Sequence, residues 1–227
     1  MMIVVNRKSR SPIFYKASPT KTAGSFVRNY IDTHTEYECV HPQHILNGNH
    51  ICMEQGGKVG IPWKEKSQHR PYRAMINLFR DFLDKDLPIW GTVRHPYDRF
   101  VSQLRFMSVE TNKQPFFPQT NPMESKSFFA NNMWQLFLPQ HYYYFDNDHQ
   151  VGEYVKIEEV QGEVLNVHGV EIDFGADKHW TNEQAMEYNT SDTSPNISIE
   201  PFELTDSLKE LCYFHYKKDF ELLGYDY

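Results

Sequence analysis

The sequence predicts an α/β fold, with a central and mainly parallel sheet flanked by helices in three layers. Short apolar strand candidates alternate with amphipathic helix candidates along the chain, which is the order that builds parallel sheets. The chain has 227 residues. At this length, folding buries about 70% of the surface that the unfolded chain exposes. We therefore expect one domain over residues 1–227 that needs no disulfide bonds.

The N-terminal segment is predicted to run from a strand through a tight turn into a helix. Residues 13–15 form a short apolar run, and apolar side chains recur at helical spacing over residues 21–33. Residues 36–69 contain Asn-Gly-Asn and Gly-Gly, which are turn signals. This stretch is therefore expected to be irregular.

The middle of the chain carries two helix candidates on either side of one buried strand. Residues 73–83 and 97–108 have the helical period, and the apolar run at 88–93 predicts the strand. Prolines between residues 111 and 122 predict a loop, and loops of this length are often functional. Residues 111–150 are expected to form an insertion of loop and helix.

The remaining elements continue the alternation of strands and helices. Residues 151–157 are predicted to form a strand, and the Pro-containing stretch 191–201 a loop. The helical period predicts the remaining three elements as helices, over 127–138, 161–167 and 205–222.

Composition excludes several classes of protein. The net charge is −7 with histidine neutral, whereas nucleic-acid-binding proteins carry a basic stripe. The cysteines are scattered without CxxC or Cys/His spacing, so neither a disulfide framework nor a metal site is predicted. No apolar run approaches the ~20 residues of a membrane span, and the N-terminal apolar stretch is too short for a signal peptide. We expect a soluble cytoplasmic protein without nucleic-acid or membrane partners.

The first candidate site is the segment SPTKTAGSF at residues 18–26, between the predicted strand and helix. A helix N-terminus presents N–H groups and a partial positive charge, which suit phosphate. Lys21 adds a cation, and Thr22 and Ser25 add hydroxyl donors. Gly24 allows a ligand to approach the backbone closely. The Walker A pattern of nucleotide hydrolases is absent.

The second candidate site is the segment RHPYDRFVS at residues 94–102. Arg94 follows the buried strand and should emerge at the carboxyl edge of the sheet, where open α/β sheets bind ligands. Its forked guanidinium can bind a phosphate, and Ser102 can donate a hydroxyl. Arg99 is instead expected to form a surface or structural ion pair with Asp98 or another carboxylate.

Together the two segments resemble those of the sulfotransferases that use 3′-phosphoadenosine 5′-phosphosulfate (PAPS). The likeness is closest to the carbohydrate branch, with heparan 2-O-sulfotransferase, chondroitin sulfotransferases and bacterial and phage relatives. RHPYDRFVS matches the family's RxPxxRxxS segment in full. SPTKTAGSF is similar to the family's PKTAGTS-like loop. It departs from that pattern where Thr20 separates Pro19 from Lys21 and where Phe26 takes the place of a small residue.

Two further segments are similar to the same family. YVKIEEV at residues 154–160 looks like the strand ending in glutamate that family members carry after their acceptor region. The tail at residues 216–225 is similar to the family's Tyr-x-x-Asp-Phe-x-x-x-Gly-Tyr ending. The resemblance therefore reaches most of the chain and is weakest in the middle third.

The resemblance implies a P-loop-like three-layer fold and a metal-free transfer of sulfonate from PAPS to a hydroxyl. The first segment would hold the 5′-phosphosulfate, and the second would hold the 3′-phosphate. Lys21 would also act in catalysis, by neutralising the charge on the leaving phosphate. The residues implied in cofactor binding are Lys21, Thr22, Ala23, Gly24, Ser25, Phe26, Arg94 and Ser102.

The transfer needs a base that removes the acceptor's proton, and histidine suits this role near neutral pH. His69 is the first candidate among 11 histidines, because the resembling family has a base histidine at a similar distance before the second segment's strand. His141 is the second candidate, and His34 is the third.

The acceptor is expected to be a carbohydrate hydroxyl, because residues 134–144 are rich in aromatic side chains that could stack on sugar rings. The same side chains would also suit a protein core, and tyrosyl or small-molecule hydroxyls stay open as acceptors. Two other classes stay open. One is a PAPS- or nucleotide-binding protein on this fold without turnover, and the other is an atypical P-loop kinase that needs ATP and magnesium.

Overall fold

The computed structural model describes residues 1–40, 86–111, 137–175 and 204–227. These residues form a mixed α/β structure built on a five-stranded sheet in the order β3-β1-β2-β4-β7. The predicted elements at 73–83, 127–138 and 191–201 lie mainly or wholly outside the described residues. The strands are β1 (Met2–Asn6), β2 (Pro12–Ala17), β3 (Tyr37–Val40), β4 (Ile89–Val93) and β7 (Glu153–Lys156).

The sheet is half antiparallel, which corrects the expectation of a mainly parallel sheet. β2 and β4 are parallel, as are β4 and β7, but β1 runs antiparallel to both β2 and β3. The sequence analysis assigned no strand to β1 or β3. Only a short turn joins β1 to β2, and a connection of this length can join only antiparallel neighbours.

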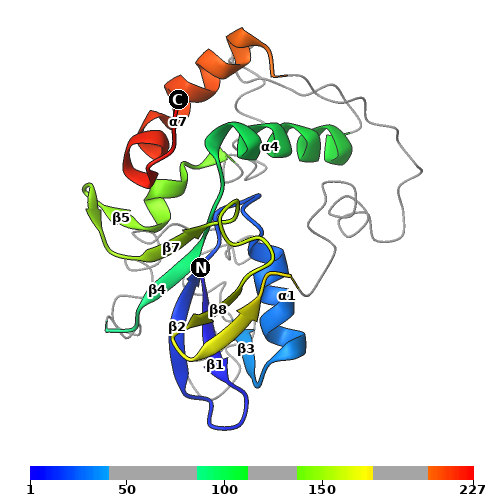
Figure 1. Cartoon of the computed structure of the whole chain (residues 1–227), viewed down its shortest axis with the longest axis vertical. Coiled ribbons are helices and arrows are strands. Elements are labelled where there is room, and N and C mark those ends of the chain that lie inside the picture. Colours follow the sequence, from blue (N-terminus) through cyan, green and yellow to red (C-terminus); the bar gives the residue numbers. More distant parts are fainter. Residues whose placement is uncertain (41–85, 112–136, 176–203) are drawn as a thin grey trace, which may run out of the picture.

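The two faces of the sheet pack against different elements (Figure 1). Helix α1 (Gly24–His34) and the hairpin of β8 (Val164–Val167) and β9 (Val170–Asp173) share an apolar core with one face. The other face packs against the 3₁₀ helix η5 (Gln140–Tyr143), strand β5 (Phe145–Asp146) and the end of α7 (Asp206–Leu223). Strand β6 (His149–Gln150) pairs with β5. The sheet is therefore covered on both faces within the described residues.

The β8–β9 hairpin contradicts the helix predicted over 161–167. His168 and Gly169 both have positive φ angles, 51° and 86°, and they connect the paired residues Val167 and Val170. A two-residue turn of this kind matches the twist of paired strands. The clear alternation of apolar and polar side chains begins only after this turn, outside residues 161–167.

The helices begin and end close to the predicted positions. Helix α4 (Pro96–Thr111) follows β4. Helix α7 packs against α4, with Phe220 of α7 in one apolar cluster with Phe100 and Leu104 of α4. The Thr205 side chain accepts a hydrogen bond from Leu208 N at the start of α7. No helix within the described residues is long and apolar enough to cross a lipid bilayer.

Candidate functional site

The two candidate segments leave neighbouring parallel strands at one edge of the sheet. Ala17 lies beside Gly91 in the β2–β4 pairing. The first segment begins directly after β2, and Arg94 is the first residue after β4. Because carboxyl ends of parallel strands meet at one edge, the segments start side by side.

The first loop, residues 18–23 between β2 and α1, is held by a hydrogen bond of its own and by one from β4. Lys21 and Ala23 both adopt left-handed backbone conformations, with φ angles of 61° and 59°, and for this reason α1 begins at Gly24 and not at residue 21. The Thr22 hydroxyl donates to the Pro19 carbonyl at 2.9 Å, and the Thr22 carbonyl accepts from the Thr92 hydroxyl. Thr22 is buried. Its hydroxyl therefore closes the loop, in contrast to its expected role as a donor to a ligand.

The start of α1 lies directly after this loop. The N–H groups of a helix's first turn have no acceptor within the helix, and Gly24, Ser25 and Phe26 occupy that turn. Ser25 is exposed. The Phe26 ring packs against Phe174, with ring centroids 5.9 Å apart. Phe26 can therefore contribute a backbone group to a ligand site, while its ring belongs to the core.

The structure brings Lys21 and Arg94 into electrostatic contact. Burial, as the larger cause, and the positive charge of Arg94 together lower the pKa of Lys21 to about 8. Both side chains are only partly exposed. The predicted cations of the two segments therefore act on one another across the sheet edge.

The backbone at Arg94 is held by groups from outside its strand. Gln140 accepts from Arg94 N and donates to Arg94 O, both at 2.8 Å. Glu158, from the segment after β7, accepts from His95 N at 2.7 Å. Ser102 lies further along, within α4, and is partly buried.

Sequence reasoning missed Lys16, which lies beneath the first loop. Its side chain is 1% exposed, and its ammonium donates to Ser18 Oγ at 2.7 Å and to Gly24 O at 2.8 Å. Burial lowers the pKa of Lys16 to about 8. Lys16 thus links the beginning of the loop to its end. A polar residue inside an apolar strand run was the available signal.

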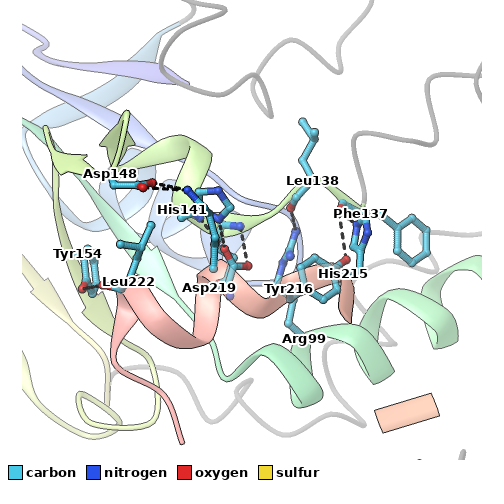
Figure 2. Close-up of polar contacts among 12 residues, drawn as sticks. Arg99, Phe137, Leu138, His141, Asp148, Tyr154, His215, Tyr216, Asp219 and Leu222 are labelled. Atoms are coloured by element: carbon cyan, nitrogen blue, oxygen red, sulfur yellow. Dashed lines mark hydrogen bonds and ion pairs between the residues drawn. The ribbon is translucent and has the colours of Figure 1, made fainter. Parts of the chain in front are cut away.

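Arg99 is buried, which rules out the surface form of the predicted ion pair. The side chain is 1% exposed. Its Nε donates to Thr20 O at 2.9 Å, and its Nη2 donates to Leu138 O at 2.7 Å. The guanidinium also lies 5.3 Å from the ring centroid of Tyr216 (Figure 2). Arg99 therefore ties the first loop to α4, α7 and the segment before η5.

The three histidines predicted as candidate bases differ in their positions relative to the site. His69 lies outside the described residues. His141 is buried, and its Nδ1 lies 2.7 Å from Asp219 Oδ1 (Figure 2). His34 is at the opposite end of α1 from the loop, about 15 Å away along an 11-residue helix. Its ring stacks on Tyr30. His34 is therefore too far from the loop to take the proton there.

The ending of the chain at residues 216–225 has a structural role in this molecule. Asp219 is fully buried and accepts from the backbone N–H groups of Gln140 and His141, each at 2.8 Å. Gly224 ends α7 in the left-handed conformation, and Tyr225 donates to Glu158 at 3.2 Å. The tail thus supports η5 and the segment after β7.

The described part of the aromatic segment expected to face an acceptor, residues 137–144, is largely core. Tyr143 and Tyr144 are 1% and 0% exposed, and Tyr144 donates to Thr92 O at 3.0 Å. Burial raises the pKa of both hydroxyls above the ordinary tyrosine value. Tyr142, at 47% exposure, is the ring of this trio that solvent reaches.

Comparison with known proteins identifies no relative: no family model, no curated protein and no solved structure matches the chain. The candidate site therefore stands on its residues and their geometry.

Proposed function

We propose that this chain is a sulfotransferase that moves a sulfonate group from PAPS to an acceptor hydroxyl. The observation that carries the proposal is that the segments of Lys21 and Arg94 leave neighbouring parallel strands at one sheet edge, where the charge of Arg94 acts on Lys21. Two like charges in a partly buried site repel one another, and an anion between them relieves that repulsion. PAPS is anionic at both its 5′ and 3′ positions, so one molecule can satisfy both cations.

The proposed chemistry is an in-line displacement at sulfur. The acceptor oxygen forms a bond to sulfur while the bond from sulfur to the 5′-phosphate oxygen breaks. The electron pair of that bond leaves with 3′,5′-adenosine bisphosphate. Lys21 and the N–H groups at the start of α1 stabilise the charge that grows on the leaving phosphate. His69 is the proposed base that receives the acceptor's proton, and no metal takes part.

The proposal also covers the class of the fold and the nature of the acceptor. We propose that the sheet with its two covered faces is the centre of a P-loop-like three-layer fold. The acceptor is proposed to be a carbohydrate hydroxyl. This is supported by the family resemblance and by the exposed ring of Tyr142, since aromatic faces stack on sugar rings.

Calorimetry with 3′,5′-adenosine bisphosphate and with ATP tests the cofactor. The proposal expects binding of the bisphosphate without added metal and much weaker binding of ATP, with or without magnesium. Preference for ATP with magnesium would support the kinase alternative and contradict the proposal.

A transfer assay with radiolabelled PAPS and a panel of glycan, phenol and small alcohol acceptors tests turnover. We expect label to pass to at least one glycan. Binding of bisphosphate without transfer to any acceptor in the panel would favour the binding protein without turnover.

A further inference from the structure

Side chains from two other segments hold three successive backbone groups at the end of β4. The Gln140 amide forms hydrogen bonds with both Arg94 N and Arg94 O, and the Glu158 carboxylate accepts one from His95 N. The β4–β7 ladder ends with the bond from Ile157 N to Val93 O. Beyond Val93, hydrogen bonds to side chains therefore replace those of the sheet and fix the backbone direction at Arg94.

Gln140 is suited to this task because both ends of its amide are used on one residue. Its Oε1 accepts from Arg94 N and its Nε2 donates to Arg94 O, each at 2.8 Å. Two bonds to one residue restrict rotation of its backbone, whereas a single bond leaves the residue free to turn about that bond. Because the Gln140 side chain is fully buried, water cannot replace these bonds without a large rearrangement.

Gln140 is itself anchored by α7. Its backbone N–H donates to Asp219 Oδ2 at 2.8 Å. Asp219 Oδ1 accepts from His141 N at 2.8 Å and lies 2.7 Å from His141 Nδ1. Figure 2 shows Asp219 reaching from α7 toward His141. A buried carboxylate with several donors is well satisfied, so it makes a rigid support.

The contacts form a continuous series from α7 to the second candidate segment. Asp219 holds the start of η5, η5 carries Gln140, and Gln140 holds the backbone of Arg94. Both polar groups of the Gln140 amide form hydrogen bonds with that backbone. Gln140 would therefore affect a bound ligand through Arg94.

We infer that Gln140, anchored by Asp219, is a positioning residue that aims the Arg94 guanidinium at the 3′-phosphate of the bound nucleotide. The inference rests on the proposed function, because it assumes that Arg94 meets that phosphate. Misplacing a binding group by a fraction of an ångström to an ångström costs affinity steeply, so loss of the amide should weaken the 3′-phosphate contact about tenfold.

The test is calorimetry of Gln140→Met with two ligands that differ only in the 3′-phosphate. Methionine keeps the length of glutamine but has no amide. The affinity for 3′,5′-adenosine bisphosphate should fall about tenfold, and that for adenosine 5′-monophosphate should stay unchanged. In an Arg94→Ala background the same substitution should make no further difference.

Gln150→Met is the matched control, since Gln150 is exposed on β6 and its amide donates to Gly152 O. This variant should bind both ligands as the wild type does. The ratio of the two affinities is also insensitive to a partly unfolded sample, which lowers the active fraction for both ligands equally.

Gln140→Glu provides a second variant if the methionine substitution prevents folding. It retains an acceptor for Arg94 N but loses the donor to Arg94 O. It too should lose affinity for the bisphosphate alone. An unchanged bisphosphate affinity, or an equal loss for both ligands, overturns the inference. A wild type that does not bind the bisphosphate overturns the proposed function itself.

Discussion

At the scale of single residues, the proposed phosphate binding depends on the positive charge of Lys21. Burial and the nearby Arg94 lower its pKa to about 8, so the side chain is mostly cationic at neutral pH. A bound phosphate stabilises the cation and raises that pKa. Binding the bisphosphate above pH 8 must therefore take up a proton.

This linkage predicts how affinity depends on pH. Above pH 8 the association constant for 3′,5′-adenosine bisphosphate should fall as pH rises, with a slope that approaches about tenfold per pH unit by pH 9.5, the slope of one proton taken up. Below pH 8 the curve should flatten toward pH 7.5. Calorimetry across this range gives the slope. Lys21→Met should bind more weakly and show a smaller decline, and an undiminished slope in that variant would assign the proton elsewhere.

A second prediction separates binding from transfer at the same residue. Lys21→Ala should lower kcat by more than it weakens bisphosphate binding, because the charge on the leaving phosphate is largest in the transition state. Steady-state kinetics with PAPS and calorimetry with the bisphosphate provide the comparison. Equal losses in both would give Lys21 a binding role without a role in the chemical step.

Lys16 gives a prediction about stability. Its folded-state pKa is about 8, against 10.5 for a lysine in water, so the unfolded chain binds more protons between these values. The side chain therefore makes the protein more stable as pH rises from 8 to 10.5, by up to about 3 kcal/mol.

Urea unfolding of the wild type and Lys16→Met at pH 7.5 and pH 10 measures this effect. The wild type should gain free energy of unfolding relative to the variant as pH rises. Lys218→Met is the control, since Lys218 is paired with Asp148 at the surface and its pKa is raised. That variant should keep the rise. A pH-independent difference between the wild type and Lys16→Met would contradict the burial of its charge.

At the scale of elements, Arg99 joins the parts around the candidate site. Arg99→Met should lower the free energy of unfolding by about 3 kcal/mol or more, because the carbonyls of buried Thr20 and partly buried Leu138 lose the Arg99 donor. Arg28→Met, on the exposed face of α1, removes a surface pair with Asp32, and such a pair is worth about 0.5 kcal/mol. Urea unfolding compares them. Equal effects would contradict a central role for Arg99.

The elements with a clear period were predictable from sequence. The strands at 13–15, 88–93 and 151–157 and the helices at 21–33 and 97–108 are confirmed by β2, β4, β7, α1 and α4. β1 was missed because its residues Ile3 and Val4 are both buried, on opposite faces. Such a strand shows no alternation.

The supports of the site could not be predicted, because they join residues far apart in the chain. Arg99 and Thr20 are separated by 79 positions, and Arg94 and Gln140 by 46. A glutamine or an arginine in a helix has many possible partners, and only the packing of η5 and α4 against the sheet selects these ones. The positions of Lys21 and Arg94 were predictable since each lies in a segment that begins directly after a strand.

At the scale of the whole molecule, the mixed sheet still places its two functional segments on parallel neighbours. The antiparallel strands β1 and β3 lie on the far side of β2 from β4. The edge between β2 and β4 therefore keeps the arrangement on which the proposal depends. Buried polar contacts from α4, η5 and α7 then fix the chain where it leaves this edge.

The central claim is that Lys21 and Arg94 bind opposite ends of one nucleotide, and a crystal structure with 3′,5′-adenosine bisphosphate tests it most directly. We predict the 5′-phosphate within hydrogen-bond distance of Lys21 Nζ and the first N–H groups of α1, and the 3′-phosphate against the Arg94 guanidinium. A bisphosphate bound elsewhere, or held by only one of these side chains with the other turned away, would contradict the account.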